Sequence, residues 1–380
     1  MLRIEQIVLR EIRLPLKEPF RISSGVVSER RIGLLELTDG DGVTGWSECV
    51  AGEQPNYSPE TIDTAWHAIR EWLAPRVVSQ SIEHADRVFA TLDANVRGHN
   101  MAKAAVEMGC WDVAARQRSV SLSRMLGGTR DRVATGISIG IQSSPAALVQ
   151  RAKSAFDQGY RKIKMKIQPG ADVEYVRAVR DALGPAVHLM VDANSAYTIA
   201  DADDLARLDA FDLIMLEQPL GRDDLVRHAE LQRRLATPIC LDESITDVDR
   251  AEDMIALKSG RIINIKPGRV GGFTPSRAIH DVCQRNAVPV WCGGMLESGI
   301  GRGHNVALAS LPNFSLPGDL SPSSRYWARD IVTPEWTMDD DGMVHVPLDR
   351  PGIGVSVNMD RVDDLTVRSE RLGRVSAVAV

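Results

Sequence analysis

The sequence lacks the features that would place the chain in a membrane or outside the cell. Across 380 residues, no apolar run approaches the ~18 residues that a membrane helix requires. Residues 1–16 alternate charged and apolar side chains, which does not suit a signal peptide. The five cysteines are far apart and form no CxxC pair. We therefore expect reduced thiols in a cytoplasmic protein that has no membrane segment.

Several common kinds of site are also missing from the sequence. There is no G-x-S-x-G motif of a nucleophilic serine and no histidine pair at metal-binding spacing. The net charge is −6 and basic residues are interspersed with acidic ones, so no nucleic-acid surface is predicted. A G-x-G-x-G run at 299–303 has no acidic partner of a dinucleotide site, although a helix N-terminus there could hold a carboxylate of a substrate.

What the sequence does contain begins with an α+β pattern over residues 1–130. Alternating apolar residues predict strands at 3–14 and 32–37, and Asp39-Gly40-Asp41-Gly42 predicts a turn before a third strand at 43–49. Residues 18–28, which include Pro19 and Gly25, are expected to form a mobile loop. Helical periodicity follows at 59–78, 84–95 and 100–118.

From residue 131 the pattern changes to short apolar runs, each followed by an amphipathic stretch. This alternation predicts a parallel sheet with helices outside it. The runs lie at 134–141, 162–167, 187–191, 213–216, 238–241, 262–265, 288–291 and, less clearly, 314–316. Eight runs favour a closed (β/α)₈ barrel over residues 131–320, with seven strands as the alternative. Residues 321–380 are irregular and are expected to return to the first domain.

Charged residues follow the barrel runs at a regular interval. Lys166, Asp192, Glu217, Asp242 and Lys266 lie 26, 25, 25 and 24 residues apart, which is one βα unit each time. A barrel brings successive strand ends to one rim, where enzymes of this architecture have their active sites. We therefore expect two amines and three carboxylates to meet at one mouth.

Three carboxylates on neighbouring strands repel one another unless a cation neutralises them. A hard divalent cation such as Mg²⁺ suits all-oxygen ligands. The alternative is that each acid caps the helix that follows its strand. The common spacing and the flanking lysines favour the metal site.

Lys164 and Lys166 form a K-x-K pair. Residues two apart on a strand face the same way, so both amines are predicted to point into the site. The alternative is a solvated charge run, because Arg161 and Lys162 precede the pair. The apolar residues that alternate with the lysines favour a buried strand. A lysine base beside bound Mg²⁺ is suited to removing a proton α to a carboxylate.

These segments resemble the enolase superfamily, in its muconate-lactonizing subgroup, and most closely the o-succinylbenzoate synthase / N-acylamino acid (N-succinylamino acid) racemase family. The motifs that carry the resemblance are KIKMKIQPG at 162–170, VDANSAY at 191–197, LEQPL at 216–220, CLDES at 240–244, NIKPGRVGG at 264–272, VWCGGMLESGIG at 290–301 and LPNFSLPGD at 311–319. The resemblance extends over nearly the whole chain. It implies a TIM-like barrel with an α+β capping domain built from the N-terminal region and the C-terminal tail.

The resemblance also implies roles for individual residues. Lys166 and Lys266 would be the acid/base pair, with Lys164 supporting them. The metal ligands for Mg²⁺, or for Mn²⁺ or another divalent ion in its place, would be Asp192, Glu217 and Asp242. The residues near a small carboxylate substrate would be Ser138, Asn194, Gly293, Gly294, Tyr326 and Phe20, with the 18–28 loop closing over it.

Two reactions share such a site. A racemase of N-acylamino acids uses one lysine on each face of the substrate, and an o-succinylbenzoate synthase of menaquinone biosynthesis removes the proton and expels hydroxide. The motifs do not separate the two activities; our first interpretation is the racemase, with o-succinylbenzoate synthesis as the alternative or as a second activity of the same site. A catalytically silent binding module would lack a lysine or an acid, and none is missing. Family resemblance further suggests a homo-oligomer.

Overall fold

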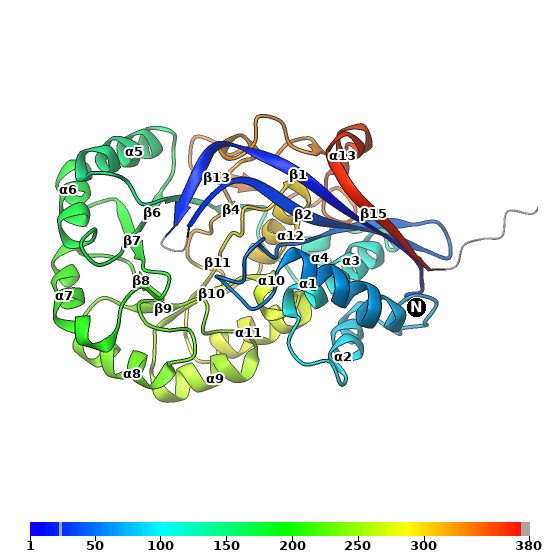
Figure 1. Ribbon diagram of the computed structural model, residues 1–380, viewed down its shortest axis with the longest axis horizontal. Helices are drawn as coiled ribbons and strands as arrows, with labels where there is room; N and C mark the ends of the chain where they lie inside the picture. The colour runs from blue at the N-terminus through cyan, green and yellow to red at the C-terminus, as the bar shows by residue number, and fades with distance from the viewer. Residues whose placement is uncertain (23–24, 374–380) are drawn as a thin grey trace, which may run out of the picture.

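Alternating apolar residues produce an antiparallel sheet from both ends of the chain. The computed structural model describes residues 1–22 and 25–373. The sheet has the strand order β15-β1-β2-β3 (Figure 1). Its strands are β1 (Ile4–Ile22), β2 (Gly25–Asp39), β3 (Thr44–Cys49) and β15 (Thr366–Gly373). The last strand therefore packs beside the first.

The expected loop at 18–28 is wrong in its secondary structure. β1 runs on to Ile22 and β2 begins at Gly25, and Phe20 pairs with Val27. A register shift between Pro15 and Phe20 interrupts the ladder, which lets two extended strands continue past prolines that cannot donate to it. Residues 23 and 24 lie outside the described residues. The mobility of this segment stays a prediction.

Helices of the capping domain pack between this sheet and the barrel. The expected helix at 100–118 is confirmed as α3, which is buried on all sides from Met101 to Ala115, as suits a helix enclosed by protein. The other two expected helices are broken into shorter pieces. The elements are α1 (Ile62–Ala68), the π-helix η1 (Ile69–Leu73), the 3₁₀ turns η2 (Ala74–Arg76) and η3 (Ala85–Arg87), α2 (Val88–Asp93), α3 (Asn100–Gln117) and α4 (Leu122–Leu126).

The apolar runs of the second domain form a parallel sheet of seven strands. Every neighbouring pair is parallel, in the order β11-β10-β9-β8-β7-β6-β5. The strands are β5 (Gly136–Ile139), β6 (Lys162–Lys166), β7 (His188–Asp192), β8 (Leu216–Glu217), β9 (Ile239–Leu241), β10 (Ile262–Ile265) and β11 (Val290–Cys292). The first seven predicted runs are confirmed.

The eighth run, at 314–316, forms no strand of its own. It makes only isolated parallel bridges, from Phe314 to Val290 and from Gly318 to Thr135. Pro317 lies between these bridges and cannot donate a ladder hydrogen bond. The segment still reaches both edges of the sheet and closes a TIM-like barrel, because Val290 belongs to β11 and Thr135 precedes β5.

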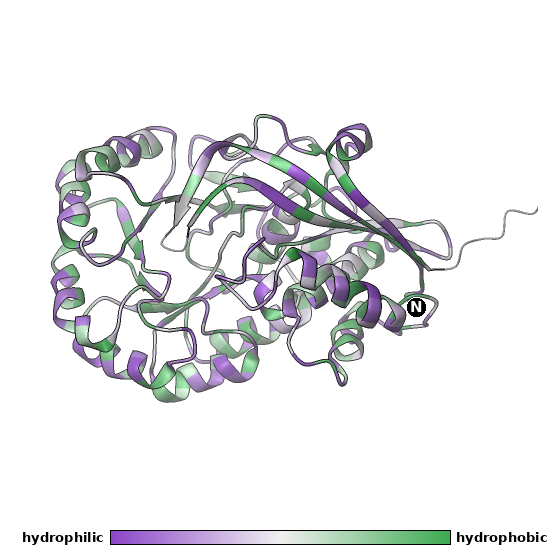
Figure 2. Ribbon diagram, in the orientation of Figure 1, coloured by the Kyte–Doolittle hydropathy of each residue, from purple (hydrophilic) through white to green (hydrophobic). Residues whose placement is uncertain are grey.

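Helices surround the barrel, and aspartate residues cap the N-termini of three of them. Asp172, Asp224 and Asp247 accept N–H groups at the N-termini of α6, α8 and α9. The outer elements are α5 (Pro145–Asp157), α6 (Val173–Leu183), η4 (Ile199–Asp201), α7 (Ala202–Ala206), η5 (Arg207–Phe211), α8 (Leu225–Arg234), α9 (Val248–Leu257), α10 (Pro267–Val270), α11 (Phe273–Arg285) and α12 (Gly299–Ala309). Figure 2 shows hydrophilic and hydrophobic residues alternating along these helices.

After the barrel, the chain crosses back to the capping domain. Two small antiparallel pairs, β4 with β13 and β12 with β14, precede the final strand. β4 (Arg132–Ala134) precedes the first barrel strand. The elements after the barrel are η6 (Ser323–Arg325), β12 (Val332–Thr333), β13 (Met343–His345), β14 (Ser356–Val357) and α13 (Met359–Leu365). The domain boundaries at 130/131 and 320/321 stay predictions. No helix within 1–22 or 25–373 is long and apolar enough to cross a bilayer.

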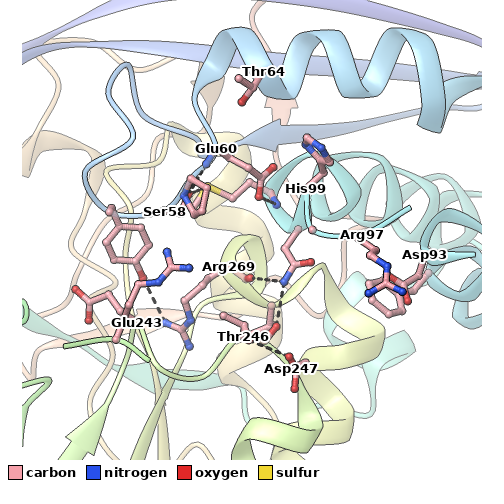
Figure 3. Close-up of a pocket in the computed structure, with 18 of the residues that line it drawn as sticks. Ser58, Glu60, Thr64, Asp93, Arg97, His99, Glu243, Thr246, Asp247 and Arg269 are labelled. Carbon is pink, nitrogen blue, oxygen red and sulfur yellow. Dashed lines mark hydrogen bonds between the residues drawn. The ribbon is translucent and has the colours of Figure 1, made fainter. Parts of the chain in front are cut away.

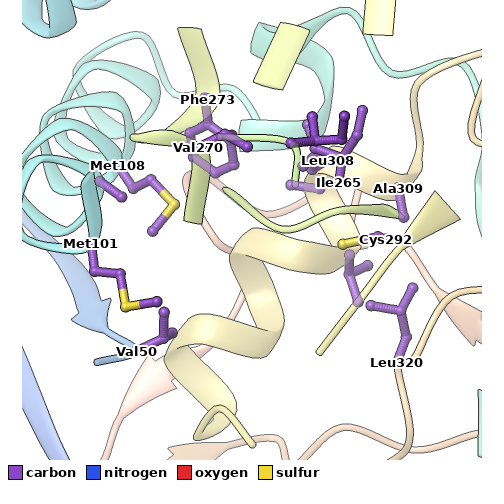
Figure 4. Packing of buried hydrophobic residues seen from close by; sticks show 14 of the residues in the cluster. Val50, Met101, Met108, Ile265, Val270, Phe273, Cys292, Leu308, Ala309 and Leu320 are labelled. Atoms are coloured by element: carbon purple, nitrogen blue, oxygen red, sulfur yellow. The ribbon is translucent and has the colours of Figure 1, made fainter. Parts of the chain in front are cut away.

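The main apolar core continues from the capping domain into the barrel. Met101 and Met108 of α3 belong to the same buried cluster as Val270 and Phe273 of the barrel helices (Figure 4). Phe273 is fully buried, so its replacement by alanine should cost roughly 3–5 kcal/mol. The continuous core fixes the capping domain over the barrel's C-terminal rim.

Candidate functional site

Backbone register places the predicted charged residues at one rim. Lys166 is the Cα partner of Asp192, and Asp192 is the partner of Glu217. Asp242 directly follows β9, and Lys266 directly follows β10. The five residues therefore occupy the C-terminal ends of the successive strands β6 to β10, where barrel enzymes build their sites.

Lys164 joins two of the acids. Its Nζ lies 3.2 Å from Asp192 Oδ2, 3.1 Å from Glu217 Oε2 and 2.7 Å from Asp319 Oδ2. Burial opposes the charge on Lys164, but the three carboxylates outweigh it and hold its pKa well above the usual value. Lys164 is 3% exposed, so the alternative of a solvated charge run is wrong here.

Lys166 is held by the loop that follows β7. Its Nζ lies 2.5 Å from Asp192 Oδ2 and 2.6 Å from Asn194 Oδ1. Asn194 has a φ of 42°, a left-handed conformation that asparagine tolerates better than most residues. Its backbone N–H donates to Asp192 Oδ1 at 3.0 Å, which turns its side chain toward the lysine.

Lys266 is separated from Lys166 by three intervening strands and has its own partners. Its Nζ lies 2.7 Å from Asp242 Oδ2, donates to Tyr57 Oη at 3.2 Å, and sits 4.6 Å from the centre of the tyrosine ring. Arg269 also pairs with Asp242, through Oδ1. Burial opposes the charge on Lys266, but Asp242 outweighs it and raises the lysine pKa.

The three acids influence one another, which places them in a single electrostatic cluster. Burial and the charges of Asp192 and Asp242 together raise the pKa of Glu217 to about 8, against the opposing charge of Lys164. Burial opposes the charge on Asp192 too, but Lys166 and Lys164 outweigh it and lower the pKa of Asp192. None of the three acids begins a helix, so the capping alternative is wrong for them.

The donor set of these acids fits a divalent cation. Asp192 and Glu217 already contact one common cation, the ammonium of Lys164. Three buried carboxylates supply the hard oxygen ligands that Mg²⁺ prefers. Within the described residues, no acidic, histidine or cysteine side chains form a group that could hold a metal ion as they stand, since these oxygens face lysines and Arg269. Binding of an ion by Asp192, Glu217 and Asp242 stays a prediction.

Two predicted substrate-binding residues, Ser138 and Gly293, lie beside the lysines, and a third, Gly294, lies beside Asp319. Ser138 on β5 is the Cα partner of Lys164, and its buried Oγ has no hydrogen-bond partner among residues 1–22 and 25–373. A Cβ on Gly293 would lie 2.7 Å from Lys266 Cε, so only glycine leaves the amine its space. A Cβ on Gly294 would lie 2.8 Å from the Asp319 carbonyl oxygen.

Tyr326 and Phe20 are less closely tied to the cluster. Tyr326 is buried, and its carbonyl oxygen accepts the Lys17 N–H at 2.8 Å, which connects β1 to the segment after the barrel. Phe20 lies on β1 opposite Val27. Neither side chain hydrogen-bonds to the lysines or acids of the rim in the part of the chain that the structure describes. Their roles toward a substrate stay predictions.

Sequence reasoning missed several residues of this site. Asn264 donates to Glu217 Oε1 at 2.7 Å, and Glu243 accepts from Asn194 Nδ2 at 3.0 Å. Both stand inside motifs that carried a predicted residue, so their positions near it were an available signal. Asp319 ends the 311–319 motif, in which no site residue was predicted. Tyr57 belongs to a loop of the capping domain, and no local pattern marks it.

An apolar floor lies below the charged residues. The fully buried Trp291 packs there in a small cluster with Met190, Met215, Cys240 and Ile262. The Nζ of Lys162 sits 3.9 Å from the centre of the Trp291 ring and 3.2 Å from Asp319 Oδ1. Burial lowers the pKa of Lys162. The floor excludes water from beneath the lysines, which strengthens every charge interaction above it.

A cleft of about 730 Å³ adjoins the Lys266 side of the site (Figure 3). Tyr57, Glu243 and Arg269 line it, and so do residues at the start of α3. The side-chain amide of Asn100 crosses between the domains, donating to the carbonyl oxygens of Thr246 and Arg269 at 3.1 Å each. The cleft therefore lies between the capping domain and the loops that follow β9 and β10.

The glycine-rich run at 299–303 does not offer its N–H groups to a substrate. Glu48 of the capping domain accepts from the N–H groups of Ser298 and Gly301 and from the Ser298 hydroxyl. Asp330 accepts from the Gly299 N–H at 2.9 Å. The anion at the N-terminus of α12 is thus a carboxylate of the protein itself, and the expected substrate carboxylate is wrong there.

Comparison of the sequence with protein families agrees with this geometry. Residues 147–361 match the enolase C-terminal domain-like family, and residues 4–127 match the N-terminal domain of the mandelate racemase / muconate lactonizing enzymes. An o-succinylbenzoate synthase of Geobacillus stearothermophilus is 49% identical, over 96% of both chains. An N-succinylamino acid racemase of Amycolatopsis sp. is 46% identical, over 98% of this chain and 100% of that protein.

A solved structure supports the same relationship. The crystal structure of an enolase superfamily member from Listeria innocua superposes with a TM-score of 0.94 at 40% sequence identity. The match covers 98% of this chain and 99% of the other. The capping domain and the barrel are therefore both shared with that protein.

Proposed function

Because this chain belongs to the mandelate racemase / muconate lactonizing enzyme family of the enolase superfamily, we propose that it racemises N-acylamino acids, N-succinylamino acids in particular. In this reaction a lysine removes the proton α to the substrate carboxylate. At 46–49% identity to an N-succinylamino acid racemase and o-succinylbenzoate synthases, the chain is an enzyme of this kind.

The observation that carries the proposal is the placement of two amines on either side of three acids. Lys166 ends β6 and Lys266 follows β10, with Asp192, Glu217 and Asp242 on the three strands between them. A planar intermediate bound between the amines presents one face to each lysine. Either lysine can then take the proton from its own face while the other returns a proton to the opposite face.

A divalent ion, Mg²⁺ by preference, would be held by Asp192, Glu217 and Asp242. When bound, it would supply positive charge where the enolate develops. The lysines released from these carboxylates would then face the substrate. Lys164, already placed between two of the acids, would orient the substrate carboxylate.

The alternative activity is o-succinylbenzoate synthesis, which the 49% identity to a synthase favours. There Lys166 would remove the proton and return it to the departing hydroxide, and Lys266 would stabilise the enolate by its charge. The two activities use the same residues, so one site can support both. All five cysteines are free and buried, which supports the further proposal of a reducing, cytoplasmic location.

Proton exchange in D₂O tests the proposal. With Mg²⁺ and an N-succinyl-L-amino acid, the protein should replace the α-proton by deuterium and scramble the chirality, as followed by NMR and polarimetry. Lys266→Ala should abolish racemisation, and Lys153→Ala, an exposed lysine of α5, should leave it unchanged. Racemisation of both enantiomers by Lys266→Ala would refute the two-base assignment. An ultraviolet assay for the aromatic dehydration product measures the alternative activity.

A further inference from the structure

The two lysines are held by separate sets of hydrogen bonds. Lys266 donates to Asp242 and to Tyr57. Lys166 donates to Asp192 and to Asn194. Asn194 continues the second set, because its Nδ2 donates to Glu243 Oε1 at 3.0 Å. Glu243 thus connects to Lys166 through one side chain and makes no hydrogen bond to Lys266 among the described residues.

The chemistry of the amide explains why this connection matters. An asparagine side chain presents an acceptor oxygen on one side and a donor NH₂ group on the other. An ammonium group can only donate, so Lys166 requires the oxygen of Asn194. An acceptor on the opposite side of the amide, the Oε1 of Glu243, keeps the NH₂ group turned away from the lysine.

Glu243 has little other structural purpose in this place. It is 9% exposed, and its second oxygen, Oε2, is buried without a hydrogen-bond partner in the described parts of the chain. A buried carboxyl with an unsatisfied oxygen destabilises a fold, and such groups call for a functional explanation. Among residues 1–22 and 25–373, the single hydrogen bond that the Glu243 side chain makes is the one to Asn194.

We propose that Glu243 is a positioning residue that sets the orientation of the Asn194 amide and thereby the place of the Lys166 amine. The inference rests on the proposed function, in which Lys166 serves one face of the substrate and Lys266 the other. Loss of Glu243 therefore slows proton transfer on the Lys166 face more than on the Lys266 face. A merely structural role would slow both faces alike.

Charge and orientation are separable by two substitutions. Glu243 lies close enough to Lys266 and Arg269 for its charge to act on both. Glu243→Gln removes the charge and keeps an acceptor oxygen for Asn194. Glu243→Leu removes the charge and the acceptor together. An effect of orientation appears only in the leucine variant.

The experiment measures α-proton exchange of each enantiomer of an N-succinylamino acid in D₂O with Mg²⁺. The enantiomer whose exchange Lys166→Ala abolishes defines the Lys166 face. In Glu243→Leu, exchange on that face should fall at least about tenfold relative to the Lys266 face, since small misplacements of a reacting group have effects of this size or larger. In Glu243→Gln the ratio of the exchange rates on the two faces should stay within about threefold of its value in the unmodified protein. In an Asn194→Ala background, Glu243→Leu should have no further effect.

Equal losses on both faces, or no loss in Glu243→Leu, would overturn the inference. A crystal structure of Glu243→Leu provides a second test of the proposal, which does not depend on a measurement of activity. The Asn194 amide should be rotated away from Lys166, and an unchanged Asn194–Lys166 hydrogen bond contradicts the proposal. If the unmodified protein exchanges neither enantiomer, the proposed function has failed, and the crystal structure still decides whether Glu243 orients Asn194.

Discussion

Lys164 and Lys166 share one oxygen atom, Asp192 Oδ2, at 3.2 and 2.5 Å. Two amines that project from the same strand are thus neutralised together by the neighbouring strand. Asp242 plays the corresponding part for Lys266 on the other side of the rim, at 2.7 Å. Each of these amines forms an ion pair with a buried carboxylate, and the carboxylates in these pairs are those expected to bind the metal. We therefore expect metal binding and release of the lysines to be coupled.

Glu217→Gln tests this coupling. Burial raises the Glu217 pKa to about 8, so a neutral glutamine should be tolerated in the metal-free protein, with a change in unfolding free energy of about 1 kcal/mol or less. The same substitution removes one of the three acids proposed to bind Mg²⁺, so the Mg²⁺-dependent rise in melting temperature should disappear. Thermal denaturation with and without Mg²⁺ measures both effects. Glu252→Gln, an exposed acid of α9, is the control and should keep the rise.

Tyr57→Phe should weaken the Lys266 side of the site alone. The hydroxyl donates to Asp242 Oδ1 at 3.0 Å and accepts from Lys266 at 3.2 Å. Its loss therefore removes one hydrogen bond of Lys266 and one of the carboxylate that pairs with Lys266. We expect a loss of stability of about 1 kcal/mol and a larger loss of exchange for the enantiomer served by Lys266. Tyr197→Phe removes a similar tyrosine–carboxylate bond, at 3.0 Å to Asp172, and should preserve the ratio of the two enantiomers. Equal changes in both variants would contradict the assignment.

Gly293→Ala should inactivate the enzyme while the fold is retained. The new methyl group would lie 2.4 Å from Asn264 Oδ1 and 2.7 Å from Lys266 Cε, so the lysine must move. The expected result is a fall in turnover of about a hundredfold or more with a folded circular dichroism spectrum. Gly221→Ala is the matched control, because a Cβ there meets nothing within 4 Å. Full activity of Gly293→Ala would show that this approach to Lys266 is not restrictive.

Stability should fall as the pH rises from about 4.5 to 7. Burial raises the pKa of Glu107 to about 7, against hydrogen bonds from Thr274 and Phe273, and raises that of Glu48 to about 7 as well. The folded chain thus binds these protons more tightly than the unfolded chain, so their contribution is present below the ordinary carboxyl pKa and is lost as the pH passes 7. Each group contributes on the order of 3 kcal/mol at most.

Urea denaturation of the metal-free protein between pH 5 and pH 8 measures this slope. Glu107→Gln should make it shallower, because glutamine does not titrate, and Glu48→Gln should act in the same way. An exposed acid, Glu252, replaced by glutamine serves as the reference and should leave the slope unchanged. Slopes of both buried-acid variants equal to that of the unmodified protein would refute the assignment.

Much of the barrel was predictable because a parallel strand covered on both faces is encoded as a short apolar run. The eighth apolar run, at 314–316, does not follow this rule. Prolines lie close to Phe314 on both sides, and the segment makes only isolated bridges. The parts of β1 and β2 that lie within residues 18–28 were expected to form a loop because Pro19 and Gly25 usually mark turns. The residues that pair there lie on the neighbouring strand, and local sequence propensity does not reveal such pairing.

The rim residues were predictable because each βα unit contributes one of them at a fixed interval. The residues that support them were not, because their partners are distant in sequence. Tyr57 reaches Asp242 only after the capping domain has packed on the barrel. The carboxylate at the α12 N-terminus was expected to come from a substrate, and it comes from Glu48, 250 residues away along the chain.

The pairing of β1 with β15 has a consequence for the order of folding. Ile12 is the register partner of Thr366, more than 350 residues later in the chain. During synthesis, one edge of β1 therefore stays unpaired until the whole barrel and then β15 have been made. An exposed strand edge invites association with other chains. The yield of soluble protein should thus depend on how quickly the final strand arrives, and on chaperones that shield the waiting edge.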